Sequence, residues 1–294
     1  MSKFPLRWDH VVHLVNDVQA PVGWFQKSGL TARPGGEHPR WGTINSLSQF
    51  GLTYIEFITL KDKEKLRQLQ EQREKVGVGF KASEDNCLVN DIVAHLPVDQ
   101  RLTRVAIRCD KHAIESLYDR LKKEGLRVME MVPGARRTTT GDLLEWKIFF
   151  VDGEGEQPSG VTDAEERAFL RKVAYPFFLE WGQETDAARL EWLDQSGGNP
   201  PHPLGAVTLQ HLVWQVEKPE VLARRWSQLL QMKQTTVQRP NGETAVALEA
   251  GEGGQLFIFE KGDANGITAL EMVTDNATAK GTTVKIGDAD YRFI

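Results

Sequence analysis

The stretch WDHVVHLV, Trp8 to Val15, is typical of a valine-rich β-strand and sets the pattern for the whole chain. An amphipathic segment over residues 18–30 follows it and predicts a helix, because Gly29 stands where a helix C-cap would. Residues 41–50, WGTINSLSQF, and 52–60, LTYIEFITL, are rich in β-branched and aromatic residues and predict two further strands. The order is therefore strand, helix, then several strands.

The same order recurs twice. It begins again with LTRVAIRC at residues 102–109 and continues to YPFFLEW at 175–181. A third copy begins with LQHLVWQV at 209–216 and continues to ITALEMV at 267–273. The last residues, 282–294, predict a hairpin that could complete the last sheet. Internal repetition of this kind means that one supersecondary unit is reused along the chain.

The predicted fold class is α+β, with repeated βαβββ modules that form a curved, barrel-like sheet. A single module cannot close its own core, so the modules should pair. We expect one domain of two paired modules over residues 1–184, and a third module with the C-terminal hairpin over residues 202–294. The third module needs another partner, and the sequence leaves open whether the hairpin or a second subunit in a homodimer supplies it.

Composition excludes several classes of function. The chain has 294 residues, with 36 Lys and Arg against 41 Asp and Glu, and this acidic balance argues against a nucleic-acid partner. No apolar stretch is long enough for a membrane span or a signal peptide, so we expect a cytoplasmic protein without a membrane partner. The two cysteines, Cys87 and Cys109, are expected to be reduced thiols.

Alignment of the three copies brings chemically useful residues into register. A glutamate inside an apolar strand is costly to bury without a cation or hydrogen-bond donors, so a repeated one calls for an explanation. The first strands align His10, Arg104 and His211, and the strands predicted as last align Glu56, Glu180 and Glu271.

With these residues, the sequence resembles the vicinal-oxygen-chelate (VOC) superfamily of glyoxalase-like domain proteins. The resemblance is carried by HPRWGTINSL, His38 to Leu47, which runs into YIEF, and by RRTTTGDLLEW, Arg136 to Trp146, which is followed by PFFLEW. It implies a glyoxalase-like barrel and a metal-assisted enzyme, of the lyase or isomerase type or the dioxygenase type, acting on a small oxygenated metabolite. The alternative is a metal-free protein of the bleomycin-resistance type that binds or sequesters a small molecule or drug.

The resemblance also implies a site. A divalent metal (Zn, Ni, Mn or Fe) would be held by imidazole and carboxylate ligands. The candidate metal ligands are His10, Glu56, His211 and Glu271, with Glu56 and Glu180 as catalytic residues. Arg104 departs from the family pattern, because a guanidinium cannot bind a metal. It could instead neutralise Glu56 and Glu180 in a metal-free pocket.

Other residues are expected to bind the small-molecule substrate. They are Arg104, His38, Asn45, Arg137, Trp146 and Phe178. Each has a purely structural alternative, since loop histidines bond turn backbone, paired arginines are often solvated, and strand aromatics usually belong to a core. His13 is expected on the strand face opposite His10, as a packed histidine either at the surface or in a core.

Overall fold

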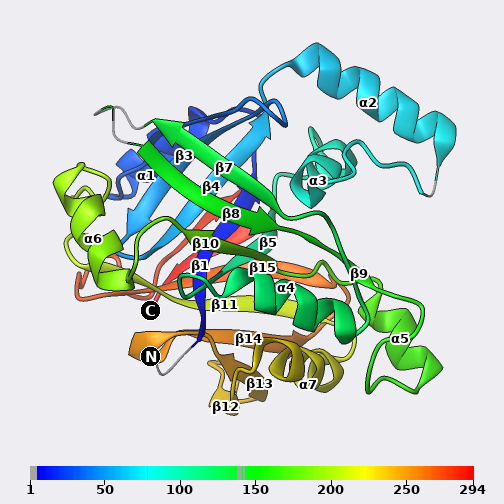
Figure 1. Cartoon of the computed structure of the whole chain (residues 1–294). Coiled ribbons are helices and arrows are strands. Elements are labelled where there is room, and N and C mark those ends of the chain that lie inside the picture. The colour runs from blue at the N-terminus through cyan, green and yellow to red at the C-terminus, as the bar shows by residue number, and fades with distance from the viewer. Residues whose placement is uncertain (1–4, 78, 138–140, 142) are drawn as a thin grey trace.

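The computed structural model describes residues 5–77, 79–137, 141 and 143–294, except for the side chains of Arg136 and Arg137. Its strands form two large sheets and a two-stranded one, with helices between and around them (Figure 1). In the part of the chain that is described, no helix is both long and apolar enough to cross a membrane.

The first sheet has eight strands in the order β2-β3-β4-β1-β5-β10-β8-β7. Strand β1 runs parallel to β4, β10 runs parallel to β5, and β1 and β5 meet antiparallel at the centre. Two βαβββ modules are thus joined through their first strands, which confirms the predicted fold. The strands are β1 (Leu6–Leu14), β2 (Arg33–His38), β3 (Thr43–Phe50), β4 (Thr53–Leu60), β5 (Leu102–Cys109), β7 (Val132–Arg137), β8 (Leu143–Phe149) and β10 (Phe177–Trp181).

Helices accompany this sheet on both faces. The helices of the two modules are α1 (Ala20–Lys27) and α4 (Ile114–Lys123), and a two-stranded sheet, β6 (Leu126–Val128) with β9 (Val151–Glu154), adjoins α4. The connection between the modules forms α2 (Lys63–Val76), which projects from the molecule in Figure 1, and α3 (Cys87–His95). After the second module come α5 (Ala164–Leu170) and α6 (Asp186–Gln195).

The second sheet repeats the strand order of the first in shorter form, β12-β13-β14-β11-β15-β17-β16. Strand β15 runs antiparallel to β11 and parallel to β17, as β5 does to β1 and β10. The prediction that residues 267–273 end the third module is therefore wrong, because they begin a shortened fourth one. The elements are β11 (Val207–Val216), α7 (Pro219–Leu230), β12 (Gln234–Gln238), β13 (Thr244–Glu249), the 3-10 turn Glu252–Gly254, β14 (Leu256–Lys261), β15 (Gly266–Thr274), β16 (Thr283–Ile286) and β17 (Ala289–Phe293).

One apolar core joins the two sheets through the faces that carry α1, α4 and α7. Trp8 of β1 meets Phe257 of β14 edge to face, with ring centroids 5.9 Å apart. A second cluster lies on the opposite, inner face of the first sheet, where α3 covers Val12 and Ile58. The shortened fourth module, which includes the C-terminal hairpin, continues the sheet of the third module through the pairing of β15 with β11. The division into domains at residues 1–184 and 202–294 remains a prediction.

His13 lies in the core between the two sheets, which is one of the two places expected for it. It is fully buried, and a hydrogen bond of 2.6 Å joins its Nδ1 to the hydroxyl of Tyr291 of β17. Burial lowers the pKa of His13 to about 4. In the unfolded chain the imidazole of His13 is protonated below about pH 6.5, whereas in the folded protein it is protonated only below about pH 4.

We therefore expect the free energy of unfolding to fall as the pH drops from 6.5 to 4, by about 3 kcal/mol from this residue alone. Urea unfolding at several pH values should show a shallower acid dependence for His13→Gln than for the parent. The exposed His112→Asn is the control and should leave the dependence unchanged. If the free energy of unfolding varied with pH in the same way in His13→Gln and in the parent, the acid dependence would not come from His13.

Candidate functional site

The inner face of the first sheet lines a cavity of about 70 Å3 that opens to solvent. Both modules contribute to its wall, because alternate residues of each strand point into the curled sheet. The lining is mainly aromatic and aliphatic, with a few polar groups. The residues that line the cavity are His10, His38, Trp41, Thr43, Asn45, Leu47, Tyr54, Glu56, Ile58, Asn86, Leu88, Trp146, Ile148, Phe150, Phe177, Leu179 and Trp181. This composition is typical of a small-molecule site.

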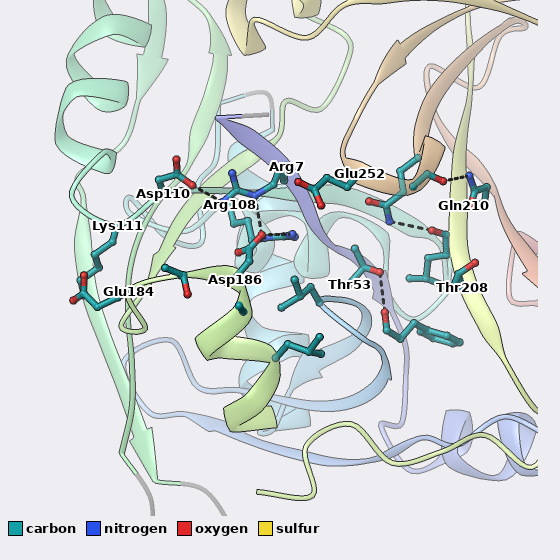
Figure 2. Close-up of a pocket in the computed structure, with 18 of the residues that line it drawn as sticks. Arg7, Thr53, Arg108, Asp110, Lys111, Glu184, Asp186, Thr208, Gln210 and Glu252 are labelled. Atoms are coloured by element: carbon teal, nitrogen blue, oxygen red, sulfur yellow. Dashed lines mark hydrogen bonds and ion pairs between the residues drawn. The ribbon is translucent and has the colours of Figure 1, made fainter. Parts of the chain in front are cut away.

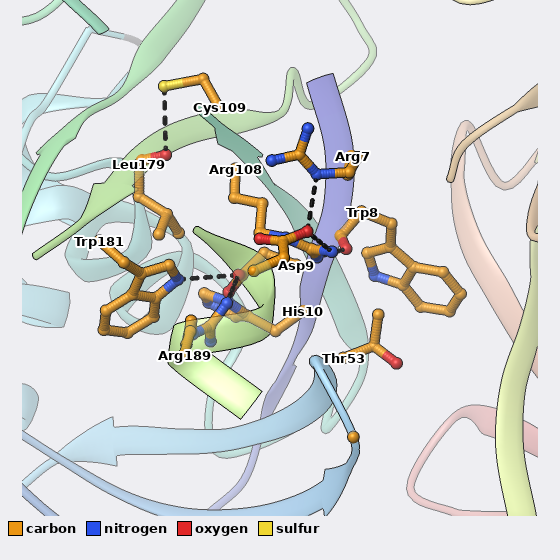
Figure 3. A network of polar contacts seen from close by, with 12 residues as sticks. Arg7, Trp8, Asp9, His10, Thr53, Arg108, Cys109, Leu179, Trp181 and Arg189 are labelled. Atoms are coloured by element: carbon orange, nitrogen blue, oxygen red, sulfur yellow. Dashed lines mark hydrogen bonds and ion pairs between the residues drawn. The ribbon is translucent and has the colours of Figure 1, made fainter. Parts of the chain in front are cut away.

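His10 is held from behind by a buried carboxylate. Its Nδ1 lies 2.7 Å from Asp9 Oδ1, and Asp9 has no exposed surface. The other oxygen of Asp9 accepts hydrogen bonds from Trp181 Nε1 at 2.9 Å and from Arg189 Nη1 at 2.6 Å. Figure 3 shows Trp181 and Arg189 meeting at Asp9. With Nδ1 occupied in this way, Nε2 of His10 is directed to the cavity side, where Glu56 lies.

Glu56 faces His10 across the wall of the cavity. Its Oε2 lies 3.5 Å from His10 Nε2, and its Oε1 accepts a hydrogen bond of 2.6 Å from Asn45 Nδ2. The amide oxygen of Asn45 is fixed in turn by the backbone N–H of Gly36. A Cβ at Gly35 would lie 2.1 Å from that oxygen, so only glycine allows β2 to approach Asn45 so closely.

The two groups shift each other's protonation in opposite directions. Burial alone would lower the pKa of His10, but its hydrogen bonds to Asp9 and Glu56 outweigh burial and raise the pKa. Burial would raise the pKa of Glu56, but the hydrogen bond and charge of His10, with His38 and Asn45, lower it. The pair therefore favours an imidazolium beside a carboxylate, which is a proton donor next to a proton acceptor.

His38, Asn45 and Trp146, which the sequence analysis expects to bind a substrate, line the cavity. His38 Nδ1 lies 2.9 Å from Thr43 Oγ1, and its ring meets those of Trp41 and Trp146 edge to face. Their roles toward a substrate remain predictions. Arg137 belongs to β7, but its side chain is outside the described part of the structure.

Glu180 and Phe178 do not face the cavity, contrary to the sequence-based alignment. Phe178 lies in the core between the sheets, stacked on Phe149, and Phe177 takes its place in the cavity wall. Glu180 Oε2 accepts hydrogen bonds from the backbone N–H groups of Ala113 and Ile114 at the start of α4. Because side chains alternate along a strand, a shift of one residue in the alignment exchanges the two faces.

Arg104 does not lie between Glu56 and Glu180 either. Its Nε and Nη2 donate to the two oxygens of Asp91 in α3 at 2.6 and 3.0 Å, and Nη1 donates to the backbone oxygen of Tyr175 at 3.0 Å. It thus fastens α3 to the second module. The expected role of Arg104 in substrate binding or charge compensation at the cavity is therefore wrong.

His211 and Glu271 form a separate pair in the second sheet. Nδ1 of His211 lies 2.8 Å from Glu271 Oε2, and the two residues are opposite each other on β11 and β15. Arg239 donates to both oxygens of Glu271, so this carboxylate is fully engaged with cations. Neither His211 nor Glu271 is among the residues that line the cavity of His10 and Glu56, so the four candidate metal ligands are not brought together there.

The residues present do not fit a divalent metal centre. Within the described residues, no group of three or more His, Cys, Asp and Glu side chains could hold a metal ion. In the cavity, His10 and Glu56 come from the first module, but the second module faces them with Ile148, Phe177 and Leu179. These hydrocarbon side chains have no ligating atoms with which to complete the coordination sphere.

A larger, open hollow lies elsewhere, at the N-terminal end of α6 (Figure 2). Two buried arginines line it, but their charges are matched within the protein. Arg7 is paired with Asp110 at 2.6 Å and with Asp186 at 2.9 Å, and Arg108 is also paired with Asp186 at 2.9 Å. Because the charges of the arginines in this hollow are compensated within the protein, the aromatic cavity beside His10 is the better candidate site.

Sequence reasoning missed Asp9, Arg189 and Tyr54, although each supports the site. Asp9 carried a usable signal, since a charged residue beside His10 in a valine-rich strand must find a buried partner. Tyr54 stacks on His10 with ring centroids 4.3 Å apart, and its place two residues before Glu56 puts it on the same strand face. Arg189 lies in the connection between the two sheets, outside any repeat, and had no such signal.

Comparisons with known proteins agree with this architecture. The family model of the glyoxalase-like domain matches residues 8–230. A hypothetical protein from Staphylococcus aureus is 17% identical, with 98% of this chain and 99% of that chain covered and a TM-score of 0.71. An extradiol ring-cleaving dioxygenase from B. fuscum is 11% identical, with 99% and 71% covered and a TM-score of 0.51. At these identities the similarity concerns the fold alone. No curated protein matches the chain.

Proposed function

The chain belongs to the glyoxalase-like domain family, and we propose that it is an enzyme of the isomerase or lyase type that moves a proton on a small carbonyl compound. The observation that carries the proposal is the pair His10 and Glu56, which lie 3.5 Å apart in the wall of a largely apolar cavity. Asp9 supports the pair from behind, as a carboxylate orients the imidazole in other acid–base sites.

Glu56 is the proton acceptor in this proposal. Its lowered pKa keeps it ionised at neutral pH, and its hydrogen bond from Asn45 fixes the direction of the carboxylate. It removes a proton from the carbon next to the carbonyl group, and the electron pair of the C–H bond moves to the carbonyl oxygen. The product of this step is an enolate, whose negative charge needs a hydrogen-bond donor.

His10 supplies that donor. Its raised pKa favours the protonated ring, and the N–H at Nε2 can give its proton to the enolate oxygen. Return of a proton to a different carbon position gives an isomerase, and loss of a leaving group from the enolate gives a lyase. No step of this scheme passes through a metal, because the donor set beside His10 and Glu56 does not fit one.

A hydrogen-exchange experiment tests the proposal. Hydroxyacetone, acetoin and phenylacetone are incubated with the protein in D2O, and NMR follows the loss of the C–H signal next to the carbonyl group. We expect exchange above the buffer rate for at least one probe, unchanged by EDTA and reduced 10²- to 10⁴-fold in His10→Gln, as is typical for loss of a general acid. Failure of every probe to exchange, although thermal shifts show that they bind, would contradict proton transfer.

The second candidate is a protein that binds or sequesters a small molecule without reaction. The observation that favours it is the aromatic wall, in which Trp41, Trp146 and Trp181 stand around the polar pair. Aromatic rings contribute affinity for flat apolar ligands whether or not a reaction follows. Binding without exchange in the same experiment would favour this function.

A further inference from the structure

Asn86 caps the N-terminus of α3 and lines the same cavity as His10 and Glu56. Its Oδ1 accepts hydrogen bonds from the backbone N–H groups of Leu88 at 2.8 Å and Val89 at 3.3 Å. Because only the oxygen of an amide group can accept these bonds, they fix which way the side chain is turned. The nitrogen, Nδ2, is therefore the atom left for the cavity.

Nδ2 of Asn86 is a hydrogen-bond donor in a buried side chain. The residue is only 2% exposed. In the part of the chain that the structure describes, Nδ2 donates to no acceptor, and Oδ1 makes all of the hydrogen bonds of this side chain. A buried amide group without an acceptor costs free energy. Such a donor in the wall of a cavity indicates that an atom of a ligand accepts from it.

The strand β4 relates Asn86 to the proton-transfer pair. Glu56 and Ile58 both line the cavity and lie two residues apart on β4, which is about 7 Å along a strand. Ile58 packs in one apolar cluster with Leu88 of α3, two residues after Asn86. A molecule that is bound beside Glu56 and extends along β4 toward Ile58 therefore approaches the start of α3.

The charges around the cavity favour a ligand atom without a charge of its own. Among the described residues that line the cavity, the basic ones are His10 and His38, and none is a lysine or an arginine. His10 already faces Glu56 at 3.5 Å. A carboxylate at the second position would add a negative charge near Glu56 without adding a cation to balance it. A cavity of about 70 Å3 also indicates a small molecule.

We propose that Nδ2 of Asn86 donates a hydrogen bond to a second, uncharged oxygen of the substrate, so that the site is specific for small ketones with a hydroxyl or ether oxygen near the carbonyl group. This inference rests on the proposed function, since it names the class of substrate for the same site. A plain ketone of equal size leaves Nδ2 without an acceptor, and binding sites reject analogues that lack a polar group for this reason. Asn86 determines specificity and takes no part in the proton transfer.

Two pairs of ketones that differ only at the second oxygen test this proposal. Hydroxyacetone and butan-2-one differ by a hydroxyl in place of a methyl group, and methoxyacetone and pentan-2-one differ by an ether oxygen in place of a methylene group. Affinities are measured by NMR titration of the indole N–H signals of the tryptophans that line the cavity, which requires no reaction. We expect the parent to bind the oxygen-containing ketone of each pair about 10-fold more tightly than its hydrocarbon analogue.

The variant Asn86→Asp separates ligand recognition from helix capping. Aspartate caps a helix as well as asparagine does, and the N–H groups of the helix keep the new carboxylate ionised, but an oxygen replaces Nδ2. Methoxyacetone, whose ether oxygen can only accept, should lose its advantage over pentan-2-one. Hydroxyacetone can donate its hydroxyl group to the new oxygen and should keep an advantage over butan-2-one.

Asn90→Asp is the matched control. Asn90 belongs to the same helix, and its Oδ1 also accepts from two backbone N–H groups, those of Ala82 and Ser83, but it is not among the residues that line the cavity. This variant should keep both preferences. Thermal unfolding of both variants shows that they are folded before the titrations are compared.

Three results would overturn the proposal. The first is equal affinity of the parent for the two members of each pair, including no binding of any ketone at 50-fold molar excess or more. The second is an unchanged preference for methoxyacetone in Asn86→Asp. The third is tighter binding of pyruvate than of hydroxyacetone, which would mean that the second oxygen is charged.

Failure of the proposed reaction gives a different result. If no ketone exchanges its carbon-bound hydrogen while the binding preferences hold, proton transfer is wrong and the role of Asn86 stands. If hydrogen exchanges while the members of each pair bind equally well, proton transfer stands and the role of Asn86 is wrong.

Discussion

Replacing Arg225 with alanine should lower the free energy of unfolding by about 3–5 kcal/mol. Arg225 of α7 donates from Nε and Nη2 to the two oxygens of Glu154 in β9, at 2.7 and 3.0 Å. Glu154 has no exposed surface, and the hydroxyl of Tyr175 also donates to its carboxylate. The variant would leave the carboxylate of Glu154 buried without its cation. The free-energy cost of that unpaired charge exceeds the cost of the lost packing alone.

The neighbouring Arg224 provides the matched control for this prediction. Its side chain is 58% exposed and pairs with Glu166 at the surface, at 2.7 Å. A surface ion pair of this kind contributes about 0–1 kcal/mol, so Arg224→Ala should unfold in urea almost like the parent. The double variant Arg225→Met with Glu154→Leu should recover much of the loss, because it removes both charges together. If Arg224→Ala and Arg225→Ala lost the same free energy of unfolding, the buried ion pair would stabilise the protein no more than the exposed one does.

The same ion pair explains how the two sheets are fastened. Arg225 belongs to the helix of the third module, whereas Glu154, Glu124 and Ser159 belong to the second, and Arg225 also donates to the backbone oxygens of the latter two. Together with the bond between His13 and Tyr291, these contacts cross the common core at separate points. We therefore expect the urea curves of the parent to show one cooperative transition.

Hydrophobic patterning was sufficient to predict the repeated βαβββ modules, because side-chain alternation and helical periodicity are local properties of the chain. It also placed His10, Glu56 and Asn45 on strands, whereas their expected roles in a site came from the family resemblance. It failed for residues 267–273, because a last strand and a first strand of a module have the same composition. Only the pairing of β15 with β11 and β17 tells the two apart.

The sequence also could not predict which charged residues from distant segments would form ion pairs. Arg104 stands where His10 does in the alignment, but Asp91 of α3 holds it, and nothing in the repeat predicts where that connecting helix lies. Arg189 shows the converse case, since a residue outside every repeat is a direct partner of Asp9. Both are long, charged side chains, whose partners depend on tertiary packing and not on local periodicity.

Glu56 and Glu180 offer the sharpest comparison, because both are buried glutamates in similar strand sequences, YIEF and FLEW. Glu56→Gln should reduce the exchange of carbon-bound hydrogen 10²- to 10⁴-fold while ligand affinity changes only a few-fold, because an amide cannot accept the proton at neutral pH. The pKa of His10, followed by NMR, should fall in this variant, since the carboxylate of Glu56 helps to raise it.

Glu180→Gln should behave differently because its carboxylate accepts the N–H groups of Ala113 and Ile114 and does not face the cavity. The amide is a weaker acceptor at a helix N-terminus, so the free energy of unfolding should fall by about 1 kcal/mol while exchange and the pKa of His10 stay unchanged. If Glu180→Gln lost as much exchange as Glu56→Gln, the proton acceptor would have to be sought on both modules. A loss confined to Glu56→Gln would mean that the first module alone supplies the acid and the base, and the second module the apolar wall against which the substrate is held.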